Sequence, residues 1–272
     1  MEKKKEERQE TMNFQKYQKN PVVNYPEREW PNKEIEHAPI WVSVDLRDGN
    51  QALVEPMNVN EKMEMFELLL KLGFKEIEIG FPAASQIEFD FLRKLVRENK
   101  IPDDVKVQVL TQCRKELIDR TFEAVEGIKN VVIHIYNSTS VLQRDVVFHK
   151  EKDEITQIAI EGVRMVKDHL NSFDGNVWLE YSPESFSGTE PEYAAEICNA
   201  VIKEWNHATP YPVIINLPNT VEKASATKAV ETLSDITSPV FRSTSPLDKT
   251  AKAVSEQTMI VSANTSNMPH IP

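Results

Sequence analysis

Short β-branched runs alternate with longer stretches of helical period between Trp41 and Asn216, and this alternation constrains the fold more than any other feature. The runs predict strands near residues 41–45, 75–80, 105–110, 131–136, 176–181 and 212–216. The stretches between them predict helices near residues 60–72, 85–99, 114–126, 151–170 and 190–205. A helix between two strands returns the chain to the same end of a sheet, so the strands are expected to be parallel. The chain is therefore predicted to be an α/β protein.

A parallel sheet can be doubly wound or closed into a barrel. A doubly wound sheet that binds nucleotides usually carries a glycine-rich phosphate turn after its first strand. Gly49 stands alone after the first predicted strand, and neither G-x-G-x-x-G nor G-x-x-x-x-G-K occurs in the sequence. A TIM (β/α)8-type barrel is favoured. Only about six βα units are recognisable, so the barrel is predicted to be incomplete, with open edges on its first and sixth strands.

The composition changes along the chain and suggests three parts. Residues 1–20 mix charges of both signs with few apolar side chains and are predicted to be a charged tail. Residues 21–222 form the predicted partial barrel domain. Residues 223–272 are rich in Ser and Thr and have scattered apolar positions, so a tail without regular structure is expected there.

The overall charge narrows the classes of partner. The chain has 43 acidic and 32 basic residues, a net charge of −11, which argues against nucleic acid or an anionic membrane as the main partner. No apolar run approaches the roughly 18 residues of a membrane helix, so a soluble, cytoplasmic protein is expected. Cys113 and Cys198 are too few for a disulfide framework or a thiolate metal site, and both are predicted to be small buried hydrophobes.

Polar residues gather where the predicted strands end. In parallel barrels the reactive residues lie at the carboxyl ends of the strands. The candidates at these ends are Asp45, Arg47, Asp48, Glu78, His134, Tyr136, Ser182, Glu184, Asn216 and Thr220.

The chemistry of the first candidates leaves two interpretations open. The Arg47 guanidinium could bind a carboxylate or carbonyl oxygen, and the Asp48 carboxylate could bind a hard divalent cation. A surface ion pair at a strand end would have the same sequence. His134 and Tyr136 are two residues apart on a strand and so project to one face, where they predict a polar site or a hydrogen-bonded core histidine.

The roles of the candidates after the fifth and sixth predicted strands are also open. Pro183 is expected to end the fifth strand and to leave Ser182 and Glu184 in a rim loop. Glu184 could then be a general acid or base, or a solvated carboxylate. Thr220 could contact a ligand or cap a helix.

Six segments together resemble the 2-isopropylmalate synthase family in its long bacterial and fungal form. They are "SVDLRDGNQAL", "KEIEIGFPAASQIEFDF", "VLTQCR", "HIYNSTS", "LEYSPESFSGTE" and "INLPNTVE". The resemblance runs in order from about Met12 to Glu222. Homocitrate and citramalate synthases and hydroxymethylglutaryl lyases share the Arg-Asp strand end but resemble the other segments less.

The resemblance implies a catalytic barrel that joins acetyl-CoA to 3-methyl-2-oxobutanoate, the keto acid, in leucine biosynthesis. It implies that Asp48 is a ligand of a divalent cation (Mg, Mn or Zn), that Arg47 polarises the ketone and that Glu184 does acid–base work. The remaining implied contacts with the keto acid site are Glu78, His134, Tyr136, Ser182 and Thr220. A homo-oligomer that binds keto acid and acetyl-CoA, and neither nucleic acid nor membrane, is expected.

The chain departs from the family after Glu222. The family's other metal ligands lie in a His-x-His motif, which this sequence lacks, and His270 is the only histidine after the matching region. The eighth strand, the linker and the leucine-binding regulatory domain are also not recognisable. Weak metal binding is therefore expected. Two hypotheses remain: a truncated acyltransferase with weak or no activity alone, or a non-catalytic binding or interaction protein derived from the enzyme.

Overall fold

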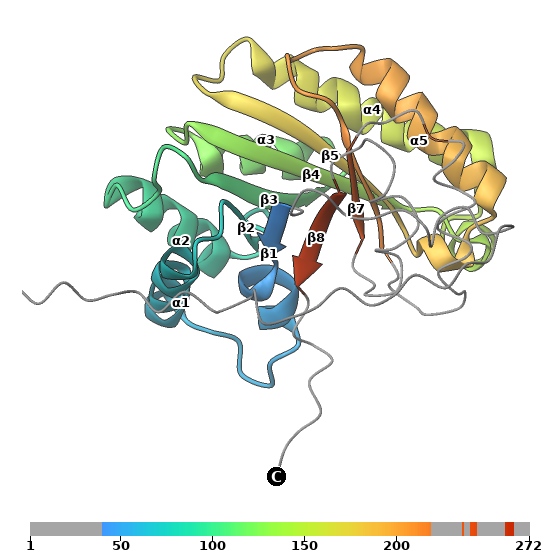
Figure 1. Ribbon diagram of the computed structural model, residues 1–272. Coiled ribbons are helices and arrows are strands. Elements are labelled where there is room, and N and C mark those ends of the chain that lie inside the picture. The colour runs from blue at the N-terminus through green and yellow to red at the C-terminus, as the bar shows by residue number, and fades with distance from the viewer. Residues whose placement is uncertain (1–39, 219–235, 237–239, 244–258, 264–272) are drawn as a thin grey trace, which may run out of the picture.

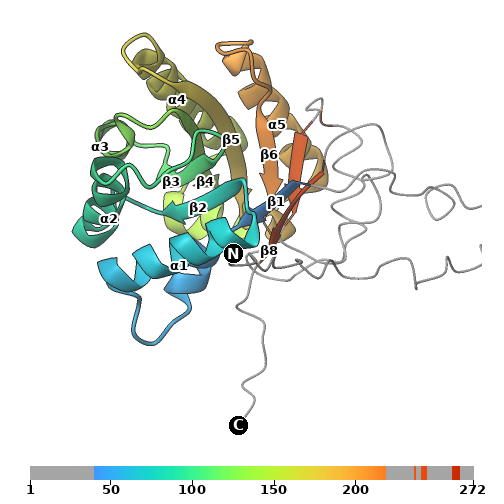
Figure 2. The same cartoon turned by 60° about the vertical axis from the view of Figure 1, so that its left-hand side comes forward.

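The structure is a computed structural model that describes residues 40–218, 236, 240–243 and 259–263. Parallel strands form a closed barrel in the order β1 to β8 (Figure 1). The strands are β1 Ile40–Ser43, β2 Glu76–Gly80, β3 Lys106–Gln112, β4 Asn130–Ser138, β5 Asn176–Glu184, β6 Ile214–Leu217, β7 Val240–Ser243 and β8 Met259–Ala263. The helices are α1 Val59–Leu72, α2 Gln86–Arg97, α3 Lys115–Val125, α4 Lys152–Leu170 and α5 Pro191–Trp205. Figure 2 shows these helices on the outer side of the curved sheet.

The six predicted strands and five predicted helices are confirmed, with ends that shift by a few residues. One shift matters for the site: β5 does not end at Pro183 as predicted but continues to Glu184. The Glu184 carbonyl accepts a hydrogen bond from the Thr139 backbone N–H after β4, so the backbone of Glu184 faces β4. The backbone of Pro183, one residue earlier, therefore faces the β6 side. The pairing of β5 with β6 stops at Tyr181, so no ladder bond is lost at the proline. Ser182 and Glu184 therefore lie on a strand.

The prediction of open edges on the first and sixth strands is wrong. β1 pairs with β8, with Ile40 opposite Ile260, and β6 pairs with β7, with Ile214 opposite Val240. The composition of the tail concealed these strands, because two short strands do not stand out in a Ser- and Thr-rich segment whose apolar positions are scattered. Within the described residues no helix follows β6 or β7, so the last two units appear as strands alone.

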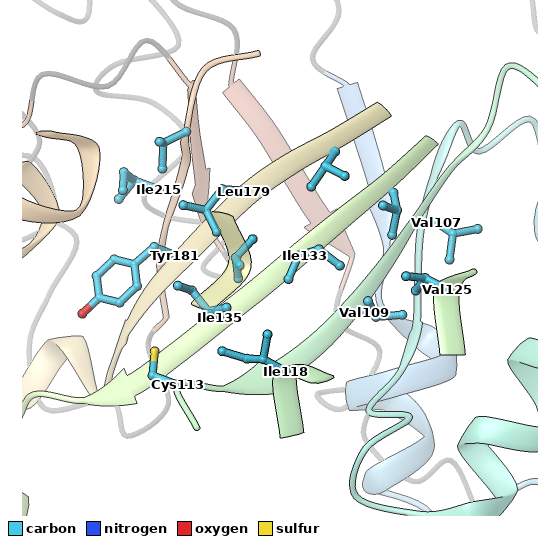
Figure 3. Close-up of a cluster of buried hydrophobic side chains, with 14 of the residues drawn as sticks. Val107, Val109, Cys113, Ile118, Val125, Ile133, Ile135, Leu179, Tyr181 and Ile215 are labelled. Atoms are coloured by element: carbon cyan, nitrogen blue, oxygen red, sulfur yellow. The ribbon is translucent and has the colours of Figure 1, made fainter. Parts of the chain in front are cut away.

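The two faces of the strands differ in chemistry. Odd-numbered residues of β2 to β6 point outward and pack against the helices in one apolar cluster, part of which Figure 3 shows, with Val109, Ile133, Leu179 and Ile215 among its members. Even-numbered residues point inward and are mostly polar. The buried inward polar residues are Glu76, Glu78, Gln108, His134, Ser138, Glu180, Ser182 and Asn216. Strand periodicity therefore separates a packing face from a polar interior.

Other sequence predictions concern burial and the chain ends. Cys113 and Cys198 are free and buried, as predicted, and burial raises the pKa of the Cys113 thiol to about 12. No helix in the described ranges is long and apolar enough to cross a membrane. Residues 1–20 lie outside the described residues, and the domain boundaries at 20 and 222 stay predictions.

Candidate functional site

The site is built around a short turn that follows β1. Residues Asp45–Gly49 form a π-helical turn, whereas the sequence suggested a strand end. In the turn the Arg47 and Gly49 backbone N–H groups both donate to the Val44 carbonyl. Such turns are rare, and they often occur at functional positions. This one brings Arg47 and Asp48 beside the carboxyl end of β2.

Arg47 lies between two carboxylates. Its Nε and Nη2 lie 2.8 and 2.7 Å from Glu78 Oε2, and its Nη1 donates to Asp48 Oδ1 at 3.0 Å. The Glu78 side chain is 0% exposed and that of Arg47 is 16% exposed, while that of Asp48 is 37% exposed. The ion pair of Arg47 with Asp48 that the sequence left open is thus present, but Arg47 is mostly buried and also pairs with the buried Glu78.

Burial and charge oppose each other at this pair. Burial would raise the pKa of Glu78, but the Arg47 charge and the hydrogen bond with His134 outweigh it and hold the pKa well below its ordinary value. Burial would lower the pKa of Arg47, but the charges of Glu78, Asp48 and Glu180 raise it. The pair is ionised at neutral pH.

His134 connects the pair to the far side of the barrel. Its Nδ1 lies 2.9 Å from Glu78 Oε1 and 3.2 Å from Gln108 Nε2. Its Nε2 lies 2.7 Å from Ser182 Oγ and 3.5 Å from Glu180 Oε1. His134 is thus buried and has partners at both ring nitrogens, as a core histidine would, but all of these partners are polar groups of the interior.

Ser182 is the next member of this network. Asn216, on β6, donates from Nδ2 to Ser182 Oγ at 2.7 Å. Ser182 and Asn216 are 3% and 7% exposed. The hydrogen-bonded groups therefore run without a break from Arg47 on one side of the interior to Asn216 on the other.

Tyr136 and Glu184 lie nearer the rim. Gln112 donates to the Tyr136 hydroxyl at 3.0 Å, and Ser138 donates to Glu184 Oε2. Burial is the largest influence on Tyr136 and raises its pKa, to which the negative Glu184 adds while the positive Arg47 subtracts. Glu184 lies opposite Ser138 at the carboxyl ends of β5 and β4, which places it at the same end of the barrel as Arg47.

A buried lysine on the helix side of the turn holds the turn in place. Lys62, on α1, donates from Nζ to the Leu46 carbonyl at 3.1 Å and to Glu88 Oε1 on α2 at 2.6 Å. Its side chain is 1% exposed. At Gly80, where φ is +152°, a Cβ atom would lie 1.8 Å from Glu88 Oε2, so glycine allows this carboxylate to approach.

The structure brings together most of the candidates that the sequence suggested. Arg47, Asp48, Glu78, His134 and Ser182 form one connected group, and Tyr136 and Glu184 lie at the same end. Asp45 accepts a hydrogen bond from Ser43 Oγ at 2.7 Å. Thr220 lies outside the described residues.

The sequence prediction missed two interior residues, because it took its candidates from the carboxyl ends of the strands. Gln108 and Glu180 lie one step deeper than the ends of β3 and β5, yet both contact His134. The signal was present in the sequence: "VKVQVL" and "NVWLEY" each place a polar side chain on the face opposite the apolar residues.

The described residues do not by themselves fit a divalent metal. Among them no group of three or more His, Cys, Asp or Glu side chains is arranged to hold one. Asp48 is accessible but is paired with Arg47. Further ligands would have to come from outside the described ranges.

Comparisons with known proteins agree with this architecture. A family model described as HMGL-like matches residues 38–248. The chain is 55% identical to a 2-isopropylmalate synthase of Clostridium acetobutylicum over 217 residues, which are 79% of this chain and 39% of that protein. It is 57% identical to one of Agrobacterium fabrum over 210 residues, 77% of this chain and 38% of that protein. The chain thus spans about two fifths of the length of these relatives.

Solved structures support the fold alone. An HMG-CoA lyase from Bacillus subtilis superposes with a TM-score of 0.63 at 14% identity, over 83% of this chain and 76% of that one. An HMG-CoA lyase from Pseudomonas aeruginosa gives a TM-score of 0.61, also at 14% identity and with the same coverage of both chains.

Proposed function

Because the chain belongs to the HMGL-like family, we propose that its barrel carries the condensation chemistry of a 2-isopropylmalate synthase. The substrates would be acetyl-CoA and 3-methyl-2-oxobutanoate. The observation that carries the proposal is the Arg47 guanidinium, held by buried Glu78 at 2.7 Å at the carboxyl end of the barrel. A fixed cation at this position suits an anionic keto acid, which the acidic chain as a whole would repel.

Arg47 would polarise the ketone. A guanidinium has five N–H donors, and the bonds to Glu78 and Asp48 use Nε and one donor on each terminal nitrogen. One donor on each terminal nitrogen remains for a substrate oxygen. Glu78 fixes the side chain so that the charge is in place before the ketone oxygen becomes negative.

Glu184 would move the proton. Its carboxylate is the proposed base that removes a proton from the methyl group of the thioester, and Ser138 holds one of its oxygens. The resulting enolate carbon would bond to the ketone carbon, and the ketone oxygen would take a proton to become a hydroxyl group. Hydrolysis of the thioester would then release CoA and 2-isopropylmalate.

The other site residues would bind the keto acid. Ser182 offers a hydroxyl group for a substrate oxygen, His134 and Tyr136 border the site, and Thr220 is proposed as a further contact. Asp48 is the proposed ligand for a divalent cation, which when bound would withdraw charge from the ketone. A homo-oligomeric assembly and a cytoplasmic location belong to the same proposal.

One observation favours a second candidate, a protein that binds the keto acid without turning it over. The Asp48 carboxylate already pairs with Arg47 at 3.0 Å, and the sequence has no His-x-His motif to complete a metal site. The binding residues of the interior do not depend on such a motif.

The two candidates separate in one experiment. The purified chain is incubated with acetyl-CoA, 3-methyl-2-oxobutanoate and Mg, Mn or Zn, and release of the CoA thiol is measured beside calorimetric binding of the keto acid. Keto-acid-dependent thiol release that Glu184→Gln lowers by about 10²-fold or more supports the synthase. Binding without thiol release supports the second candidate, and neither binding nor release contradicts both.

Arg47→Lys is the matched variant for the guanidinium. It keeps the positive charge but loses the planar donors that hold Glu78 and the substrate together, so a severe loss of turnover or of keto acid binding is expected. Unchanged values would remove Arg47 from the proposed mechanism.

A further inference from the structure

We propose that Glu180 is a positioning residue that keeps a proton on His134 Nε2 and thereby turns the Ser182 hydroxyl toward the keto acid. The inference rests on the proposed function, because it assigns a role within the same site. Glu180 lies on β5, two residues before Ser182, and is 1% exposed. It does not border the rim, so its effect on a substrate would pass through its neighbours.

His134 has two acidic neighbours. Each of its ring nitrogens faces a carboxylate: Nδ1 faces Glu78 at 2.9 Å, and Nε2 faces Glu180 at 3.5 Å. A neutral imidazole carries one proton and can donate to one side only. A proton on Nε2 faces the Glu180 carboxylate, whose negative charge favours that position for the proton. The Gln108 amide beside Nδ1 can present either end, since the two ends of an amide are assigned from their partners.

The Ser182 hydroxyl has one proton and two lone pairs. Asn216 donates to one lone pair at 2.7 Å. If His134 Nε2 carries a proton, it donates to the other lone pair at 2.7 Å. The Ser182 proton then has no role within this network and is available to a substrate oxygen. If Nε2 carries no proton, Ser182 must donate to it and offers the substrate nothing.

Glu180 and Glu78 face different ring nitrogens of His134. Glu78 is already paired with Arg47 at 2.7 Å, so its charge is opposed by the guanidinium. Glu180 is the acid on the Nε2 side, where the contact with Ser182 is made. Removal of its charge therefore acts on the nitrogen that orients the hydroxyl, while the pair of Arg47 and Glu78 is left intact.

The first test needs no substrate. Nitrogen-15 NMR of the ligand-free protein at pH 7 reports whether each ring nitrogen of His134 carries a proton, with His134→Asn used to assign the signal. Wild type is expected to show a proton on Nε2, and Glu180→Gln is expected to lose it. Glu76→Gln is the matched control, because Glu76 is a buried inward carboxylate that pairs with Lys106 away from His134. The absence of a proton on Nε2 in wild type, or no change in Glu180→Gln, would overturn the inference.

The second test uses binding of 3-methyl-2-oxobutanoate by calorimetry. Glu180→Gln is expected to weaken binding about tenfold or more, because the charged acceptor loses a donor. Ser182→Ala should weaken it similarly, and the double variant should be no weaker than Ser182→Ala alone. Additive losses would show that Glu180 acts by another route. Glu180→Asp, which keeps the charge, should recover part of the affinity if the fold is unchanged.

The two tests fail in different ways. If the protein does not bind the keto acid at all, the proposed function fails, while the NMR result for His134 still decides the role of Glu180 within the network. If the keto acid binds and the double variant is additive, the site stands and the assignment of Glu180 falls.

Discussion

The inner and outer faces of strands β2 to β6 share one backbone but are stabilised by different interactions. The outer face packs side chains such as Ile133 and Val109 against helices, and burial of apolar area stabilises it. The inner face holds Glu78, His134 and Glu180, whose burial is unfavourable unless each polar group finds a partner. The interiors of such barrels are usually filled with branched apolar side chains.

This difference separates the residues that stabilise the fold from those that form the site. A change of side-chain volume on the outer face alters packing, whereas a change of charge on the inner face alters the hydrogen bonds of the whole network. Stability and ligand binding should therefore separate between the faces, and substitutions on each face can test the separation.

The largest effect is expected for Glu78→Leu. It leaves Arg47 as a buried charge without its main partner, which should lower the free energy of unfolding by about 3–5 kcal/mol, measured by urea denaturation. The double variant Arg47→Leu, Glu78→Leu removes both charges and should recover most of that loss. If the double variant is less stable than Glu78→Leu, the pair does not have the assigned role.

A somewhat smaller loss is expected on the outer face. Ile133→Ala deletes a side chain that is 0% exposed and should cost about 3 kcal/mol through lost contacts and a cavity. Keto acid binding, measured by calorimetry on the folded protein, should be unchanged, because Ile133 does not face the interior. Weakened binding in a fully folded variant would break the separation between the faces.

The outer side also holds a charged pair, and Lys62→Met tests it. The variant removes the hydrogen bonds to the Leu46 carbonyl and to Glu88, at a cost of about 2 kcal/mol by urea denaturation. Since Leu46 precedes Arg47, keto acid binding should weaken as well. Lys115→Met, which removes an exposed pair with Asp119, is the control and should change stability by no more than about 0.5 kcal/mol.

The smallest effect is expected at Glu190, in a partly exposed pair. The hydrogen bonds from Arg144 lower its pKa from the ordinary value of 4.5 to about 2, against a smaller opposing effect of burial. Between these values the unfolded chain takes up the proton first, so the contribution present above pH 4.5 is lost as the pH falls toward 2. Its side chain is 34% exposed, so the contribution is about 1 kcal/mol or less. Glu190→Gln should flatten the stability profile between pH 4.5 and 2, and an unchanged slope would contradict the assignment.

The sequence predicted the parts of the fold in which periodicity repeats. The alternation of runs located β2 to β6 and all five helices, because an outer apolar stripe and an amphipathic helix each leave a period in the sequence. It missed β7 and β8, which lie in the Ser- and Thr-rich segment where apolar positions are scattered. The π turn at Asp45 to Gly49 was missed as well, because its geometry depends on a tertiary bond from Lys62, sixteen residues after Leu46.

The candidate site was predicted residue by residue but not as a network. Strand ends gave Arg47, Glu78, His134 and Ser182, since polar residues after apolar runs are visible in a sequence. The contacts that join them depend on the register between strands, such as His134 opposite Glu180, and no local pattern specifies that register. The contact of Glu180 with His134 therefore became visible only when β4 and β5 were paired.

The pairing of β1 with β8 has a consequence for how the protein is made. Ile40 lies opposite Ile260, so the two strands that close the ring are separated by about 220 residues of chain. At about 5–20 residues per second, a ribosome needs on the order of 10–40 s to deliver the second strand after the first. During that interval one edge of β1 has no partner within its own chain, and such an edge is a template for pairing with other nascent chains. The closed ring therefore leaves this edge of β1 open to such pairing until β8 has been made.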